Sequence, residues 1–264
     1  MRLDFLHAAR RLHRTSELDE DLSGVWPDFV DCSRRMVTLG PYLDRHLPAG
    51  PDHLVLDAAA GIGCEAARLV ERGNRVIANE ISPALRACLF QAIDDKAGAT
   101  ITNHDWRELS DALGHSIFDA VILLGNSICL LLSAADRRLA LRRIYETLKP
   151  GGLLLIDQRN FALLLDRKDE VLEGRFEFRS EVMYCGRNIV GYPISVDRHE
   201  IVFAYLNPKT GWVAGFLHMS TFAEDSLESE LESIGFVDIR SDFDLGRADK
   251  STGDFIIHCC RRPS

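Results

Sequence analysis

Short apolar runs alternate with helix-patterned segments through the middle of the chain. The apolar runs are rich in Val, Ile and Leu, a composition typical of strands buried on both faces. These runs lie at residues 53–56, 75–78, 99–102, 118–124 and 153–156. Helical periodicity occurs between them, at residues 64–71, 83–94 and 136–148. This βαβα order predicts a parallel sheet with helices on both faces.

The pattern changes after residue 157, where apolar and polar side chains alternate with a period of two. The alternation covers residues 176–185, 194–206 and 212–222, around a loop at 207–211 with β-turn chemistry. We expect an antiparallel β insertion here. A helix at residues 223–233 and a final strand at residues 255–260 should then complete the core.

These patterns divide the chain into four parts. Residues 1–51 are expected to form an N-terminal lid or helical segment. Within it, the polar stretch 1–24 has the character of a mobile arm or lid, in which residues 2–14 could form one amphipathic helix. Residues 52–175 form a ligand-binding core, residues 176–222 the antiparallel insertion, and residues 223–264 the end of the core sheet. We expect the insertion to shape a substrate pocket or an oligomer contact.

Composition and charge exclude several classes of protein. Apolar residues make up 46% of the chain and charged residues 27%, which is typical of a globular protein with a sizeable core. The net charge of -9 disfavours binding to nucleic acid or to anionic lipid. The longest uncharged run, residues 120–135, is too short for a membrane span. No apolar segment of signal-peptide type is present near the N-terminus, so we expect a cytoplasmic location.

The seven cysteines include no C-x-x-C pair, and Cys259 and Cys260 are adjacent in an apolar run. This arrangement predicts buried free thiols in a reducing compartment. Neither the cysteines nor the nine histidines have the spacing of metal ligands, so we expect no metal site. Trp26 and Tyr42 are expected to pack rather than to bind a ligand, and His218 is expected to be a core or surface histidine rather than a base.

A buried strand runs directly into a loop of small residues, Ala58-Ala59-Ala60-Gly61-Ile62-Gly63. Small side chains allow a ligand to approach the backbone closely. Because a helix follows, its free N–H groups and positive dipole end face the loop and favour polar or anionic groups. The spacing Gly61-x-Gly63-x-x-Ala66 also matches the dinucleotide fingerprint, which is a weak signal alone.

Acidic residues at the strand ends distinguish a dinucleotide from other ligands that such a loop can bind. Asp57, at the tip of the first strand, suits a ligand ammonium and would repel a pyrophosphate. Glu80 ends the second strand, where a carboxylate can accept both ribose hydroxyls. Asp105 and Trp106 follow the third strand and offer an acceptor for an adenine amino group and a flat ring beside the base. Together they predict an adenosyl ligand that carries an amino acid.

In this order and spacing, the motifs resemble the class I S-adenosylmethionine-dependent methyltransferases. The resemblance covers about residues 52–156 and includes the turn Lys149-Pro150-Gly151-Gly152, with Ala59-Ala60 as a mild departure. It implies S-adenosyl-L-methionine as the cofactor. It also implies an α/β fold with a Rossmann-like, mostly parallel seven-stranded sheet, helices on both faces and a reversed last strand, to which the antiparallel insertion is added.

Two further segments are similar to glycine N-methyltransferase and to the glycine/sarcosine enzymes. They are Leu124-Gly125-Asn126-Ser127 after the fourth strand and Asp157-Gln158-Arg159-Asn160-Phe161 after the fifth. Val25-Trp26, Phe29 and Arg35 resemble the N-terminal lid of that group. The group has a histidine where this chain has Leu130, and a tyrosine nearer the position of Phe29. Because of these differences, this chain retains only part of the group's substrate contacts.

We therefore expect a methyltransferase acting on the amine of a small amino acid or a related carboxylate. Asn126 would orient the amine and Arg159 would hold the acid group through paired hydrogen bonds. The cofactor-binding residues would be Arg35, Asp57, Ala59, Gly61, Gly63, Glu80, Asp105, Trp106 and Leu124. No nucleic-acid or membrane partner is expected, and a homo-oligomer is an open alternative.

Two other functions fit the same pattern. One is an O- or C-methyltransferase of secondary metabolism, with the insertion shaping a pocket for a larger acceptor. The other is a non-catalytic regulatory protein that binds S-adenosylmethionine. Fold-level analogy carries little information about the acceptor.

Overall fold

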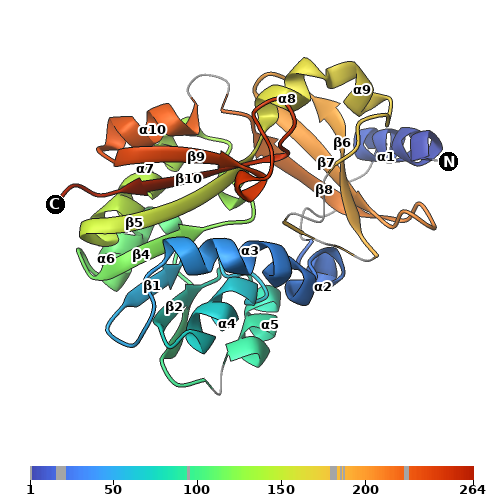
Figure 1. Cartoon of the computed structure of the whole chain (residues 1–264). Coiled ribbons are helices and arrows are strands. Elements are labelled where there is room, and N and C mark those ends of the chain that lie inside the picture. The colour runs from blue at the N-terminus through green and yellow to red at the C-terminus, as the bar shows by residue number, and fades with distance from the viewer. Residues whose placement is uncertain are drawn as a thin grey trace.

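The computed structural model describes residues 2–15, 22–93, 96–178, 183–184, 186, 188–222 and 226–264. These residues form a seven-stranded mixed sheet and a separate three-stranded antiparallel sheet. Figure 1 shows the small sheet beside one end of the large one, with the N-terminal helix on its outer side.

The large sheet carries the parallel core. Its order is β3-β2-β1-β4-β5-β10-β9, and β10 is antiparallel to both of its neighbours. The strands are β1 (Leu54–Asp57), β2 (Arg75–Asn79), β3 (Ala99–Thr102), β4 (Phe118–Leu123), β5 (Leu148–Arg159), β9 (Val237–Phe243) and β10 (Phe255–Arg261). The central strands β1 and β4 are almost wholly buried, as their continuous apolar runs predicted. The predicted Rossmann-like sheet with a reversed last strand is confirmed.

Helices cover both faces of this sheet (Figure 1). One face carries α3 (Cys32–His46), α4 (Cys64–Glu71) and α5 (Pro83–Ile93), and the other carries α6 (Leu109–Leu113), α7 (Ala134–Thr147) and α10 (Leu227–Ile234). Side-chain caps start several of them; Ser133, for example, accepts a hydrogen bond from the Asp136 N–H. In the described part of the chain, no helix is long and apolar enough to cross a membrane.

Shorter helical elements connect the strands and helices. They are η1 (Ser23–Val25), α2 (Trp26–Phe29), η2 (Trp106–Glu108), η3 (Ser127–Leu130), α8 (Phe161–Asp166), α9 (Lys168–Leu172) and η4 (Asp244–Gly246). Both η2 and η3 follow strands of the large sheet, so their first residues stand at its carboxyl edge. This is the edge where ligands bind in open α/β sheets.

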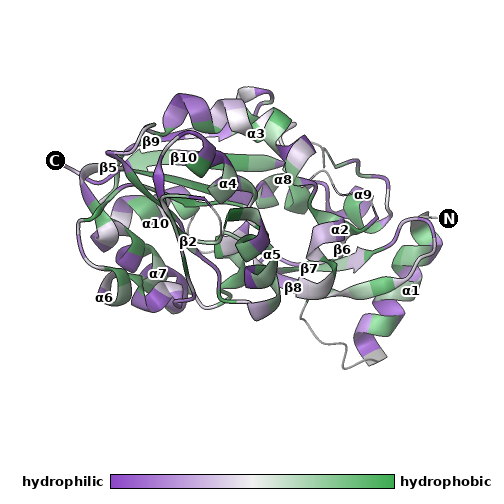
Figure 2. Cartoon of the chain, turned by 90° about the horizontal axis from the view of Figure 1, so that it is seen from below, coloured by the Kyte–Doolittle hydropathy of each residue, from purple (hydrophilic) through white to green (hydrophobic). Residues whose placement is uncertain are grey.

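The small sheet consists of β6 (Val190–Val196), β7 (Glu200–Leu206) and β8 (Val213–Ser220), and helix α1 (Arg2–Thr15) packs on it. Leu6 and Ala9 of α1 are buried against apolar side chains of all three strands. Arg10 donates a hydrogen bond from Nε to the backbone oxygen of Ile194 at 3.0 Å. In Figure 2, α1 carries both hydrophobic and hydrophilic residues, as an amphipathic helix on a sheet does. The predicted amphipathic helix at residues 2–14 is confirmed, and it packs on the small sheet.

The antiparallel insertion is confirmed, but the first predicted strand, 176–185, is wrong for the residues of it that the structure describes. Residues 176–178 and 183–184 lie in no strand, and the rest of 179–187 is outside the described residues except Gly186. The alternating Phe176 and Phe178 pack against Tyr192, whose hydroxyl donates to the Phe176 backbone oxygen at 3.0 Å. The predicted strand 194–206 is divided by a turn at residues 197–199, so β6 and β7 form its two halves.

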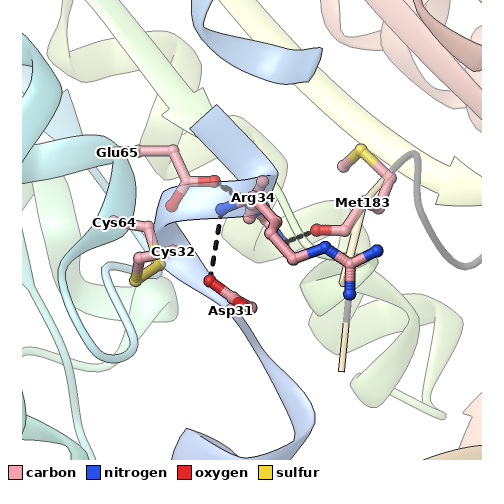
Figure 3. The surroundings of a disulfide bond; sticks show 7 residues. Asp31, Cys32, Arg34, Cys64, Glu65 and Met183 are labelled. Carbon is pink, nitrogen blue, oxygen red and sulfur yellow. Dashed lines mark hydrogen bonds and ion pairs between the residues drawn. A yellow bond between two sulfur atoms is a disulfide. The ribbon is translucent and has the colours of Figure 1, made fainter. Parts of the chain in front are cut away.

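Cys32 and Cys64 form a disulfide, which corrects the expectation that all cysteines are free (Figure 3). The two residues begin α3 and α4, and their Cα atoms are 5.1 Å apart. Packing of α3 on α4 brings them together across 32 residues of sequence, which no local motif reveals. Among the described cysteines, four are free thiols: Cys88, Cys129, Cys259 and Cys260.

Candidate functional site

A cavity of about 400 Å³ opens at the carboxyl edge of the large sheet. Its walls come from the segments that follow β1, β2, β3 and β4, from the region before α3, and from the small sheet. The sequence-predicted residues that line it are Arg35, Asp57, Ala59, Gly61, Glu80, Asp105, Trp106 and Leu124. Gly63, Asn126 and Arg159 are not among the lining residues.

The glycine loop is shaped by two residues with positive φ. Gly61 has φ +55° and donates its N–H to Glu80 Oε2 at 2.9 Å, which ties the loop to the end of β2. Gly63 has φ +91° and precedes the first residue of α4. A Cβ at Gly63 would lie 2.9 Å from Leu89 Cδ1, so this glycine allows α4 to pack closely on α5. Gly63 therefore shapes the loop from behind the cavity wall.

Asp57 is a buried carboxylate in the cavity wall. Among the described residues, its Oδ2 has no hydrogen-bond partner. Burial raises the pKa of the Asp57 carboxyl well above its usual range, and the Glu65 carboxylate raises it further. A ligand ammonium group would supply both the missing hydrogen bond and the counter-charge.

Glu80 is held in a fixed orientation at the end of β2. Its Oε2 accepts the Gly61 N–H and its Oε1 accepts the Ser82 N–H at 2.7 Å. Burial raises the pKa of the Glu80 carboxyl, while these N–H groups oppose the rise. Because each carboxylate oxygen has two lone pairs, Glu80 can still accept hydrogen bonds from a vicinal diol.

Asp105 and Trp106 lie on the same side of the cavity but differ in how they are engaged. Both Asp105 oxygens accept hydrogen bonds from the Arg107 side chain, at 2.9 and 2.6 Å, and this lowers the pKa of the Asp105 carboxyl. The Trp106 indole donates from Nε1 to the Ala58 backbone oxygen at 2.6 Å. That bond fixes the ring in the wall, where it can stack on a planar group.

Arg35 and Glu65 form a buried ion pair on the side of the cavity nearest α3. The Nε atom of Arg35 donates to Glu65 Oε1 at 2.6 Å, and its Nη1 donates to the Met183 backbone oxygen at 2.8 Å. The backbone N–H of Asp31 also donates to the Tyr184 backbone oxygen. The start of α3 is thus attached both to α4 and to the segment before β6.

Asn126 lies behind the cavity in the left-handed conformation, with φ +62°. Its backbone N–H donates to Asp157 Oδ1 at 2.6 Å. Its side-chain oxygen accepts the backbone N–H of Arg159 at 2.7 Å and the thiol of Cys129 at 2.9 Å, and its Nδ2 faces Met219 Sδ. The side chain therefore joins the loop after β4 to the end of β5.

Arg159 is buried in an aromatic box. Its Cζ lies 4.7–5.4 Å from the ring centres of Phe178, Tyr184, Phe203 and Phe255. Tyr184 also lines the cavity, so Arg159 is separated from the cavity by one aromatic layer. No hydrogen bond or ion pair joins its guanidinium to any residue that the structure describes. A buried cation of this kind favours an anionic ligand.

Part of the cavity wall comes from residues that no pattern in the sequence indicated. Trp26 was expected only to pack, but it lines the cavity as well as contacting Phe29 and Tyr205. Tyr184 and Leu217 reach the cavity from the insertion, and the Tyr184 hydroxyl donates to the Gly125 backbone oxygen at 3.0 Å. No spacing in the sequence links the insertion to the strand ends, so only the fold reveals these contacts.

Comparisons with known proteins agree with the geometry. A family described as a methyltransferase domain matches residues 55–152. The glycine/sarcosine N-methyltransferase of Parasynechococcus marenigrum is 32% identical over 95% of this chain and 86% of its own length. The glycine/sarcosine/dimethylglycine N-methyltransferase of Actinopolyspora halophila is 32% identical over 90% of this chain, which spans only 41% of that protein. The CcbJ methyltransferase of Streptomyces caelestis has a similar fold, with a TM-score of 0.64 at 14% identity over 93% of this chain and 97% of its own.

Proposed function

Because this chain belongs to the glycine/sarcosine N-methyltransferase family, we propose that it transfers the methyl group of S-adenosyl-L-methionine to the amine of a small amino acid. The proposal joins two parts of the site. The glycine loop and the strand-end acids would hold the cofactor, and the aromatic box around Arg159 would hold the acid group of the acceptor.

The residues of the cavity fit the cofactor. Asp57, with its unpaired Oδ2, would bind the ammonium of the methionine part, and Glu80 would bind the ribose. Trp106 would lie beside the base, although Asp105 is already engaged by Arg107. The sulfonium of the bound cofactor supplies an activated methyl group, so no protein nucleophile is needed.

Arg159 is the observation that carries the choice of acceptor. Its guanidinium is buried and has no counter-charge among the described residues, whereas Arg35 is paired with Glu65. A carboxylate would complete the hydrogen bonds that Arg159 lacks and neutralise its charge. Because the Tyr184 ring both lines the cavity and contacts Arg159, the acceptor would reach Arg159 by displacing that ring.

Asn126 is better suited to positioning than to direct contact with the amine. Its side-chain oxygen is already engaged by the backbone of Arg159 and by Cys129. We therefore assign to Asn126 the placement of Arg159 relative to the loop after β4. The amine would lose its proton before the transfer, so a dedicated base is not required.

An acceptor panel tests the proposal directly. The purified chain would be incubated with S-adenosylmethionine and with glycine, sarcosine, alanine, glycinamide or glycine methyl ester, and the products identified by mass spectrometry. We expect N-methylated products from the free acids and little from the amide and the ester. Equal turnover of acids and amides would contradict the role of Arg159.

The same panel addresses the two alternative functions. The relatives that align with most of this chain carry the names of N-methyltransferases, which disfavours O- or C-methylation of a larger acceptor. Tight cofactor binding with no turnover of any acceptor would instead support a regulatory protein. A cytoplasmic location and a homo-oligomer stay as proposals, and the free thiols of Cys88, Cys129, Cys259 and Cys260 support the former.

A further inference from the structure

We propose that the Cys32–Cys64 disulfide is a reversible redox site that controls cofactor affinity. The proposal rests on cofactor binding in the cavity and on the proposed cytoplasmic location, and not on the identity of the acceptor. Disulfides in reducing compartments are mostly transient or redox-sensing, so a cysteine pair at a ligand site has a regulatory meaning there.

The disulfide lies between the cavity described above and a second pocket at the surface. Cys64 lines the cofactor cavity. Cys32 lines the surface pocket, which is formed mainly by residues 27–33 together with Asn188. Val30 lines both. A thiol in solution can therefore approach Cys32 from the surface, while Cys64 belongs to the wall of the proposed cofactor cavity.

The bond also anchors the part of that wall that comes before α3. Leu22, Ser23, Trp26 and Val30 line the cavity just before Cys32, and α3 follows it. Farther along α3, the chain is held by Tyr42, whose hydroxyl donates to Asp242 at 2.9 Å. The disulfide, which Figure 3 shows, is one of the two attachments to α4 nearest to these wall residues. The other is the adjacent Arg35–Glu65 pair.

The chemistry of the site is thiol–disulfide exchange with a low-molecular-weight thiol such as glutathione. A glutathione thiolate attacks Cys32 Sγ, the S–S bond breaks, and Cys64 leaves as a thiolate and takes up a proton. A second glutathione thiolate attacks the glutathione sulfur of the mixed disulfide and releases Cys32. Two electrons pass to the protein and glutathione disulfide is formed. Both cysteines begin helices, where the positive end of the dipole favours a thiolate.

Reduction would leave the Arg35–Glu65 pair as the nearest attachment of the wall segment to α4, so the segment would be held less firmly and cofactor binding would weaken. The oxidised form keeps the segment in place before the ligand arrives, so less ordering is needed on binding. We expect the dissociation constant for S-adenosylhomocysteine to be about five- to tenfold lower in the oxidised protein than in the reduced protein.

Calorimetry of the full chain in glutathione buffers tests this. S-adenosylhomocysteine would be titrated at a high and at a low ratio of oxidised to reduced glutathione, with alkylation and peptide mass spectrometry to confirm the state of Cys32 and Cys64. Cys32→Ser should bind as weakly as the reduced parent in both buffers. Cys88→Ser, which removes a free thiol outside the cavity lining, should keep the full response.

Two results would overturn the proposal. One is an equal dissociation constant, within twofold, for parent protein shown by mass spectrometry to be fully oxidised and fully reduced. The other is failure of Cys32 and Cys64 to pair at any glutathione ratio. The parent comparison decides the matter even if Cys32→Ser does not fold. If S-adenosylhomocysteine binds equally well in both redox states, only this inference is contradicted. If it binds in neither state, the proposed function is contradicted as well.

Discussion

The side-chain oxygen of Asn126 accepts the backbone N–H of Arg159 at 2.7 Å, behind the wall of the cavity. Through this bond, the loop after β4 fixes the end of β5, from which the Arg159 guanidinium extends into its aromatic box. The two segments that resemble the glycine enzymes are thus one structural unit, and Asp157 strengthens it by accepting the Asn126 N–H.

Replacing Arg159 should affect the acceptor and not the cofactor. Arg159→Lys keeps the charge but loses the fork geometry, and Arg159→Ala loses both. We expect the acceptor KM to rise in Arg159→Lys and to rise further, about tenfold or more, in Arg159→Ala. Steady-state kinetics with the best acceptor of the panel, and calorimetry for the cofactor, measure the two effects. The exposed Arg175→Ala is the control, and unchanged acceptor kinetics in Arg159→Ala would refute the carboxylate site.

Replacing Glu80 should affect the cofactor. Glu80→Gln removes the negative charge, and its amide NH₂ would face a backbone N–H of Gly61 or Ser82. Loss of charge-assisted hydrogen bonds should weaken cofactor binding by about 1.5–3 kcal/mol. Calorimetric titration with S-adenosylmethionine measures this, with the exposed Glu232→Gln as control. A dissociation constant equal to that of the parent would exclude Glu80 from the ribose site.

Breaking the Arg35–Glu65 pair should destabilise the fold. The two side chains are only 5% and 9% exposed, so Glu65→Gln leaves a buried guanidinium without its counter-charge. We expect the free energy of unfolding to fall by about 3 kcal/mol. Glu71→Gln on the same helix removes an exposed pair with Lys96 and should cost less than about 1 kcal/mol. Urea unfolding compares the two, and equal losses would argue against this role of the pair.

Asp157 should make stability depend on pH. Burial raises the pKa of this carboxyl from 3.8 to about 6, although the Asn126 N–H and Arg35 oppose the rise. Because the folded form holds its proton at higher pH than the unfolded form, this group stabilises the fold at low pH. That contribution is lost as the pH rises from about 4 to about 6.

The Asp157→Asn variant isolates this effect. The parent should lose up to about 3 kcal/mol of its free energy of unfolding between pH 4 and pH 7 through this group, and the variant should not. His258, with a pKa lowered by burial to about 4, acts with the opposite sign in both proteins, so the difference between parent and variant is the quantity to measure. Urea unfolding curves at several pH values supply it. Parallel pH profiles would show that Asp157 titrates normally.

The sequence predicts the parallel core and its ligand edge well, for a physical reason. Strands buried on both faces need continuous apolar runs, and parallel connections place Asp57 and Glu80 at one edge of the sheet. The half-exposed β9 has no such run, and its pattern gave little signal. The alternation of apolar and polar residues around Phe176 and Phe178 predicted a strand, but these two residues pack against Tyr192 outside any strand.

Local sequence patterns could not predict contacts between segments that lie far apart in the chain. The Cys32–Cys64 bond depends on how α3 lies on α4, and the contribution of Tyr184 depends on how the insertion folds back over the cavity. Similarly, the engagement of Asp105 by Arg107 is a choice of side-chain conformation that spacing cannot predict. Sequence motifs therefore predict only some of the residues that form the cavity wall.

The packing of α1 on the small sheet affects how the chain must fold during synthesis. The bond from Arg10 to Ile194 joins residues 184 positions apart, so α1 leaves the ribosome long before its partner strands exist. At about 5–20 residues per second, Leu6 and Ala9 would wait roughly ten to forty seconds for a surface to cover them. During that interval the apolar face of α1 is exposed, which is the condition under which partly folded chains aggregate or need chaperones.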